Sequence, residues 1–91
     1  MTDLIRVLVV DNHSMFAQAV AAALREQDDI DVVGVAGTAT AGIAAVDEYA
    51  PDVVLMDYRL PDLFGDEATR VIRRTHPSTA VVVVTAAEDE E

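Results

Sequence analysis

Four short runs of β-branched and aliphatic residues recur along the chain, and polar segments separate them. Three of the runs are almost continuously apolar, which is typical of strands buried on both faces of a parallel sheet. The remaining run alternates with charged residues, so we place it at an edge of the sheet. The continuous runs are residues 5–10, 51–57 and 80–85, and the alternating run is residues 30–35.

Helical periodicity fills the intervals between these runs, because apolar residues recur there at spacings of three and four. The predicted helices cover residues 15–24, 39–50 and about 66–75. Thr38 or Thr40 is available as the N-cap of the second helix, and Pro51 ends it. The predicted apolar face of the first helix comprises Met15, Phe16, Ala19, Val20, Ala23 and Leu24.

The resulting order of strands and helices predicts a single α/β domain over residues 1–91, with a doubly wound parallel sheet and right-handed crossovers. In open sheets of this kind, ligands bind beyond the carboxyl ends of the strands. Asp11, Asp57 and Thr85 stand at the ends of three apolar strands. The sequence therefore predicts a polar site at that edge of the sheet.

Composition narrows the classes of partner. Seventeen acidic residues against six basic ones give a formal charge of −11, which would repel nucleic acid and favours a basic protein partner or a divalent cation. The chain has no cysteine, which excludes disulfides and thiolate metal sites. No apolar stretch approaches the roughly 20 residues needed to cross a bilayer, and the N-terminus lacks a signal-peptide pattern. We expect a cytoplasmic protein without membrane association.

The strand-end acids suggest a specific chemistry. Unpaired buried carboxylates cost several kcal/mol, and a shared cation would relieve that cost. Mg²⁺ prefers one or two carboxylates together with water and phosphate oxygens, a set that Asp11 and Asp57 would provide. With the charge neutralised, one carboxylate can attack phosphorus in line and form an acyl phosphate.

Three motifs resemble the receiver domain of bacterial two-component response regulators, and together they span essentially the whole chain. The segment 57–65 resembles that family's acceptor aspartate with its downstream Pro and Gly, 9–13 its acidic pair, and 83–86 its switch threonine. Segments 11–16 and 70–77 are similar to the NarL/FixJ branch, whose members usually carry a C-terminal helix-turn-helix domain.

The resemblance implies a flavodoxin-like receiver fold with strand order 2-1-3-4, in which the fifth strand and the last two helices are missing. It also implies roles for particular residues: Asp57 as phosphoacceptor, Asp11 and the backbone carbonyl of Arg59 as Mg²⁺ ligands, and Thr85 as the switch. The expected donor is a sensor histidine kinase. The expected output is transcription regulation, with DNA bound only through an absent C-terminal domain. We expect no enzyme activity beyond self-phosphorylation.

Two departures from the family pattern leave an alternative open. Asn12 stands where the family has a second metal-binding acid, and the family's conserved lysine belongs to the missing fifth strand. The chain could instead be a degenerate receiver that serves as a protein-interaction or dimerisation module without phosphorylation. An aspartate-nucleophile phosphatase is disfavoured, because Arg59 rather than an acid lies two residues beyond Asp57.

Three further expectations concern the surface. His13 and His76 are expected to be surface residues near helix ends, without a metal or phosphohistidine role. Residues 88–91 would form the start of a fourth helix. If the chain stops there, the valines of residues 81–84 would form an unprotected apolar edge, and we expect the isolated chain to form a homodimer or to aggregate.

Overall fold

The computed structural model describes residues 3–85. Strands and helices alternate in the order β1 (Ile5–Val10), α1 (Ser14–Arg25), β2 (Ile30–Ala36), α2 (Ala39–Tyr49), β3 (Val53–Asp57), α3 (Gly65–Thr75) and β4 (Ala80–Val84). These bounds agree with the sequence-based prediction to within two residues. The predicted start of a fourth helix lies outside the described residues. No helix within residues 3–85 is long and apolar enough to cross a membrane.

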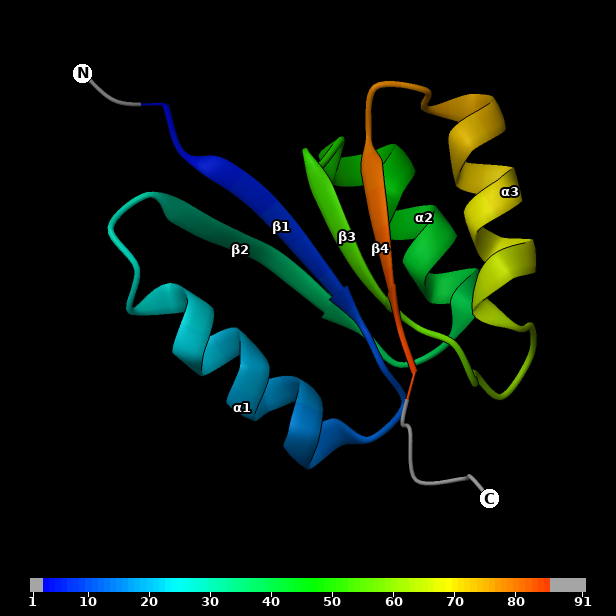
Figure 1. The fold of residues 1–91 in the computed structure, drawn as a ribbon, viewed down its shortest axis with the longest axis horizontal. Coiled ribbons are helices and arrows are strands. Elements are labelled where there is room, and N and C mark those ends of the chain that lie inside the picture. Colours follow the sequence, from blue (N-terminus) through cyan, green and yellow to red (C-terminus); the bar gives the residue numbers. More distant parts are fainter. Residues whose placement is uncertain (1–2, 86–91) are drawn as a thin grey trace.

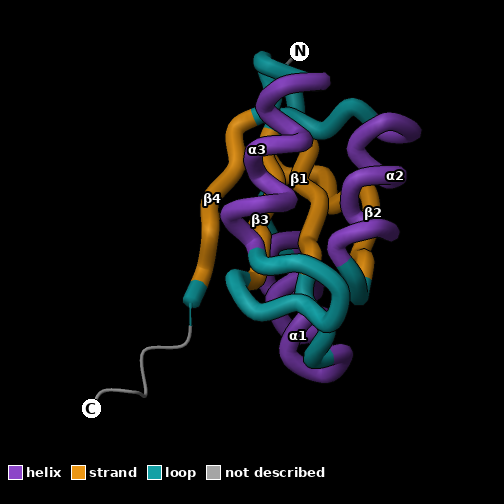
Figure 2. The backbone as a smooth tube through the Cα atoms, turned by 90° about the vertical axis from the view of Figure 1, so that its right-hand side faces the viewer, coloured by secondary structure: helices purple, strands orange, loops and turns teal. Residues whose placement is uncertain are grey.

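The four strands form one parallel sheet in the order β2-β1-β3-β4. This order confirms the predicted topology and the position of β2 at an edge. Helix α1 covers one face of the sheet, and α2 and α3 cover the other (Figures 1 and 2). The domain is therefore a three-layer α/β sandwich, as the alternation of strands and helices predicts.

The last four residues of the central strand β1, residues 7–10, are all apolar because they pack on both faces of the sheet. Leu8 and Val10 belong to a core cluster shared with α2 and α3, whereas Val7 and Val9 belong to a second cluster shared with α1. Because both faces of β1 are covered over residues 7–10, each of these four positions has a buried apolar side chain.

Helix α1 contacts the sheet through a narrower face than the sequence predicts. Ala17 and Ala21 are fully buried, whereas Met15 is 87% and Phe16 56% exposed. Most of the surface of this helix is apolar, so periodicity alone does not identify the side that faces the sheet. The predicted apolar face begins at Met15 and Phe16, whereas the residues of α1 that are buried against the sheet are Ala17 and Ala21, because small side chains make the closest approach.

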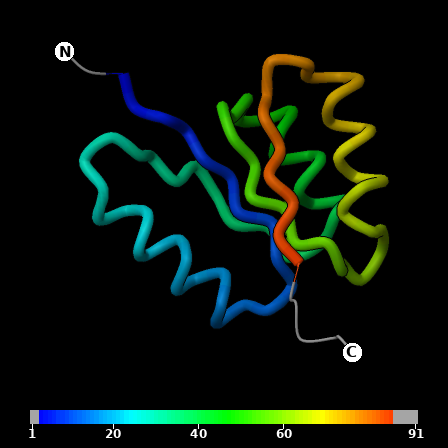
Figure 3. Tube along the Cα trace, in the orientation of Figure 1, coloured from blue at the N-terminus to red at the C-terminus, as the bar shows by residue number. Residues whose placement is uncertain are grey.

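The register of the sheet brings the carboxyl ends of three strands together. Val10 pairs with Met56, and Asp57 pairs with Val84. The strands β1, β3 and β4 consequently end at the same edge (Figure 3). Any polar residue at one of these ends lies beside those at the others.

Candidate functional site

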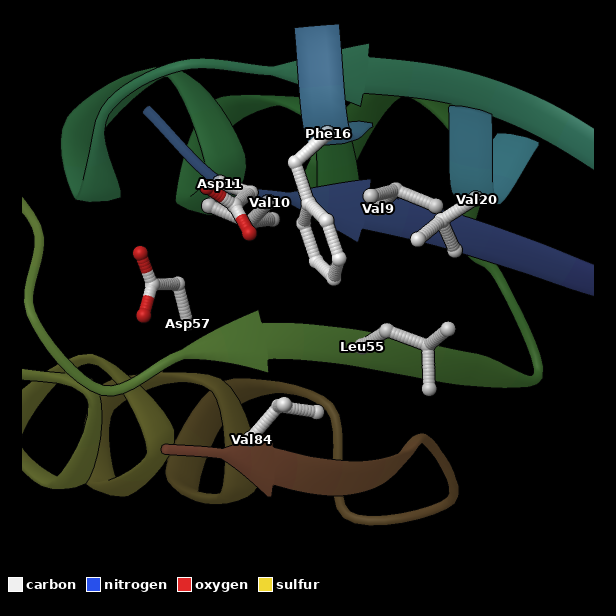
Figure 4. Close-up of a pocket in the computed structure, with 8 residues that line it drawn as sticks. All are labelled: Val9, Val10, Asp11, Phe16, Val20, Leu55, Asp57 and Val84. Atoms are coloured by element: carbon white, nitrogen blue, oxygen red, sulfur yellow. The ribbon is translucent and has the colours of Figure 1, made fainter. Parts of the chain in front are cut away.

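Two carboxylates lie side by side at this edge. Asp57 is the last residue of β3, and Asp11 follows β1 directly. Their side chains are only 13% and 12% exposed. Figure 4 shows both carboxylates beyond the ends of their strands, with the ring of Phe16 near them. The predicted pairing of these two acids is confirmed.

Asp57 has an unsatisfied oxygen. Its Oδ1 accepts a hydrogen bond from the backbone N–H of Arg59 at 3.3 Å, whereas its Oδ2 is buried and has no hydrogen-bond partner in the part of the chain that the structure describes. Burial raises the pKa of Asp57 above its ordinary value, and the neighbouring charge of Asp11 adds to this shift, although the Arg59 N–H and His13 oppose it. A buried oxygen without a partner beside a second acid fits a site for a divalent cation.

His13 also reaches both acids. Its backbone N–H donates a hydrogen bond to Asp11 Oδ1 at 2.8 Å, and its ring Nδ1 lies 3.0 Å from that same oxygen and 3.7 Å from Asp57 Oδ2. The side chain is 70% exposed, so its expected surface position is confirmed, but its contact with the acids was not predicted. The position of His13 in the sequence could have indicated this contact. His13 is the N-cap of α1, and there the chain turns back past the end of β1.

Thr85 completes the convergence of strand ends. It is exposed and directly follows β4, and it lines a pocket together with Asp11, His13, Phe16, Asp57 and Val84. Asn12 is exposed next to this group. The structure thus brings Asp11, Asp57 and Thr85 together, while the predicted roles of Thr85, Asn12 and the Arg59 carbonyl remain predictions.

Gly65 allows the segment after β3 to close tightly on the end of β3. Its N–H donates to the carbonyl of Tyr58 at 2.6 Å. A Cβ atom at this position would lie 2.8 Å from the carbonyl oxygen of Asp57 and 2.9 Å from the Cα of Tyr58. Both atoms belong to the backbone and cannot rotate away. A glycine is therefore required at the end of the 57–65 motif, because α3 approaches the backbone of Asp57 too closely for a side chain.

Comparison with known proteins decides the family. Residues 7–91 match the response regulator receiver domain. The chain belongs to this family. It is 41% identical over 87 residues to the response regulator GacA of Pseudomonas viridiflava, covering 96% of this chain and 41% of that protein. It is 38% identical over 88 residues to the transcriptional regulatory protein LiaR of Bacillus subtilis, covering 97% of this chain and 42% of that protein.

Solved receiver structures agree with this assignment. The response regulator domain of Thermotoga maritima CheB has a TM-score of 0.86 at 33% identity and covers 96% of this chain and 64% of its own. The receiver domain of the putative response regulator NarL from Mycobacterium tuberculosis has a TM-score of 0.85 at 31% identity and covers 97% of this chain and 70% of its own. The relatives confirm the predicted NarL-like branch. This receiver spans about two fifths of the length of the curated relatives.

In this receiver, Asp62 fastens the segment after Asp57 to helix α2. Its Oδ1 accepts from the N–H of Ala39 at 2.8 Å, and its Oδ2 accepts from the N–H of Thr40 at 2.9 Å and from its hydroxyl at 2.6 Å. The Thr40 hydroxyl is the largest of the causes that lower the pKa of Asp62 to about 2. Thr38 is the N-cap of α2 and accepts from the N–H of Ala41, so Thr40 is left to bind Asp62.

The Asp62 contact was not predicted, because it joins residues 22 and 23 positions apart in the chain. An aspartate next to a proline looks like an ordinary turn residue from its neighbours alone. The contact stabilises the loop that connects β3 to α3, and this loop contains the Arg59 backbone.

Replacing Gly65 with alanine should destabilise the receiver. The new methyl group must push against the backbone of Asp57, and such overpacking costs about 1–3 kcal/mol of unfolding free energy. Urea denaturation followed by circular dichroism measures the loss. Gly37→Ala is the matched control, since a Cβ there has no atom within 4 Å, and its effect should stay within about 0.5 kcal/mol. Equal stabilities of the two variants would contradict the steric role of Gly65.

Replacing Asp62 with asparagine should lower the melting temperature in a pH-dependent manner. A carboxyl group whose pKa is lower in the folded state stabilises the fold above its ordinary pKa of 3.8, and that contribution is lost as the pH falls toward about 2. Thermal melts at about pH 7 and about pH 2.5 should show a smaller difference between the original protein and Asp62→Asn at the lower pH.

The control for this experiment is Asp31→Asn, which removes the same charge from an exposed position on β2. It measures the effect of net charge without loss of a helix contact. A difference between the original protein and Asp62→Asn that is the same at both pH values would show that the Asp62 carboxylate does not stabilise the fold.

Proposed function

We propose that this chain is the phosphoacceptor domain of a two-component response regulator and that Asp57 receives a phosphoryl group from a sensor histidine kinase. The observation that carries the proposal is the buried Oδ2 of Asp57, which lacks a hydrogen-bond partner in the described part of the chain and lies at a strand end beside Asp11. Membership of the receiver family supports the same role.

The transfer is a substitution at phosphorus. A carboxylate oxygen of Asp57 attacks the phosphorus of a phosphohistidine in line, and a P–O bond forms while the P–N bond breaks. The leaving imidazole keeps the electron pair of the broken bond and takes a proton from solvent. The product is an acyl phosphate on Asp57, so self-phosphorylation is the only catalysis that we assign to the chain.

Mg²⁺ is the proposed cofactor. Asp11 and Asp57 would hold it, assisted by Asn12 and the backbone carbonyl of Arg59, and the ion would neutralise charge as the phosphoryl group approaches. Asn12 contributes a neutral oxygen where an acid would contribute a charge, so the affinity for Mg²⁺ should be lower than with two adjacent acids. The unsatisfied oxygen of Asp57 supports this assignment.

Thr85 is the proposed switch residue. It lines the same pocket as Asp57, where its hydroxyl group could donate a hydrogen bond to a phosphoryl oxygen. A phosphoryl group adds negative charge and acceptor oxygens, and a threonine that moves toward it would shift the chain after β4. The altered surface would then act on an output partner or a DNA-binding domain, because the charge of −11 disfavours DNA contact by the receiver itself.

Asp57→Asn should abolish phosphorylation. Incubation with Mg²⁺ and acetyl phosphate should add the mass of one phosphoryl group to the original protein and none to the variant, because an amide is not a nucleophile for this reaction. Intact-protein mass spectrometry measures the gain. Asp66→Asn, an exposed carboxylate of α3, is the matched control and should be phosphorylated normally.

A gain of mass that persists in Asp57→Asn would show that another residue is the acceptor. If the original protein gains no mass and does not bind Mg²⁺ in a calorimetric titration, the degenerate receiver, acting as an interaction module without phosphorylation, becomes the better description. Asn12 is the feature that favours this second function.

We also propose that the chain forms a homodimer through β4. Within the described residues β4 is an edge strand, and Val82, Val83 and Val84 are 48%, 39% and 45% exposed. A lysine at such an edge disfavours strand pairing. Sedimentation velocity over a wide concentration range should show dimers of the original protein and monomers of Val83→Lys. Monomers of the original protein at every concentration would contradict the proposal.

A further inference from the structure

We propose that His13 is a metal ligand in this receiver and that its imidazole shifts the site's preference from Mg²⁺ toward first-row transition dications such as Mn²⁺. The inference rests on the proposed function, because it assigns a further ligand to the same cation site. The inference adds His13 to the two acids, Asp11 and Asp57, from which the sequence predicted the cation site.

The geometry of the three side chains supports ligation. His13 Nδ1 lies 3.0 Å from Asp11 Oδ1 and 3.7 Å from Asp57 Oδ2, and the candidate ligand atoms of all three residues lie within 4.8 Å of one another. Metal–ligand bonds of about 2.0–2.2 Å place neighbouring ligands of an octahedral ion about 3 Å apart and opposite ligands about 4 Å apart. The distances of 3.0 and 3.7 Å from His13 Nδ1 to the two carboxylates lie within the range expected for ligands of one ion.

A second observation points to the same ion. The Oδ2 atom of Asp57 is the oxygen that contacts the imidazole of His13. This atom is buried and lacks a hydrogen-bond partner among the described residues. Two carboxylates and an imidazole nitrogen therefore converge on one space, and one of the oxygens has its coordination capacity unused.

The local sequence explains why the imidazole can take this place. Asn12, which lies between Asp11 and His13 in the sequence, is exposed and supplies no charge. His13 is the N-cap of α1, and its own N–H binds Asp11 Oδ1. This hydrogen bond fixes the orientation of the Asp11 carboxylate and holds the base of the histidine side chain over the end of β1.

The chemical consequence is a change in metal preference. Carboxylate and carbonyl oxygens suit Mg²⁺, whereas imidazole nitrogen suits transition metals, and Mg²⁺ loses its hydration water reluctantly. A set of two carboxylates and one imidazole therefore holds a transition dication better than an oxygen-only set does. A neutral imidazole would also leave the net charge of the occupied site unchanged.

Pulsed electron paramagnetic resonance of the Mn²⁺-loaded protein tests the ligation directly. A coordinated imidazole gives a ¹⁴N coupling, and histidine labelled with ¹⁵N should change that coupling without any alteration of the sequence. His13→Ser should lose the nitrogen coupling; serine keeps a favourable N-cap and is too short to reach the ion. His76→Ser removes the only other histidine, which contacts Asp47 on the surface, and should keep the coupling.

Calorimetric titration with Mn²⁺ and Mg²⁺ tests the preference. The loss of one ligand should weaken Mn²⁺ binding by about tenfold or more in His13→Ser, with a much smaller effect on Mg²⁺, and His76→Ser should bind both ions as the original protein does. A nitrogen coupling that is absent from the Mn²⁺-loaded original protein would overturn the inference, as would equal losses for the two ions in His13→Ser.

These results separate the inference from the proposed function. Phosphorylation of Asp57 with Mg²⁺ in a protein that shows no nitrogen coupling would overturn the role of His13 alone. A nitrogen coupling in a protein that is never phosphorylated on Asp57 would support the ligation and contradict the proposed function.

Discussion

The candidate site depends on the convergence of two carboxylates at the ends of adjacent parallel strands. Asp11 and Asp57 are held there by the pairing of β1 with β3, with little solvent to screen their charges. Burial raises the pKa of Asp57, and the proximity of Asp11 adds to that shift. Such an arrangement costs folding free energy unless a positive group enters. The fold therefore holds the two acids where the cation and the phosphoryl group that we propose would meet them.

The surrounding structure keeps this arrangement rigid. The absence of a side chain at Gly65 lets α3 begin against the backbone of Asp57, and Asp62 fastens the same loop to the start of α2. On the other side, His13 begins α1 and binds Asp11. Each of the three helices thus begins beside the site, either next to one of its acids or against the loop that follows Asp57, so a change at Asp57 can reach both faces of the sheet.

The sequence allowed the alternation of strands and helices and the pairing of Asp11 with Asp57 to be predicted, because both follow from apolar runs that end in polar residues. The strand order 2-1-3-4 was implied by the resemblance to receiver domains, and the structure confirms it. The sequence did not allow the prediction of contacts that depend on three-dimensional closure. Asp62 and Thr40 are far apart in the chain, and the reach of His13 depends on the direction in which α1 begins. Met15 and Phe16 belong to the predicted apolar face of α1 but are mostly exposed, because periodicity alone does not show which side of an alanine-rich helix packs against the sheet.

The central claim is that Asp57 becomes an acyl phosphate, and reductive trapping tests it most directly. Borohydride reduces an aspartyl phosphate to homoserine and leaves a free carboxylate unchanged. After incubation with acetyl phosphate and a divalent cation, peptide mass spectrometry should find homoserine at position 57 and aspartate at positions 11 and 62. Homoserine at another position, or at none while the protein remains folded and binds the cation, would contradict the account.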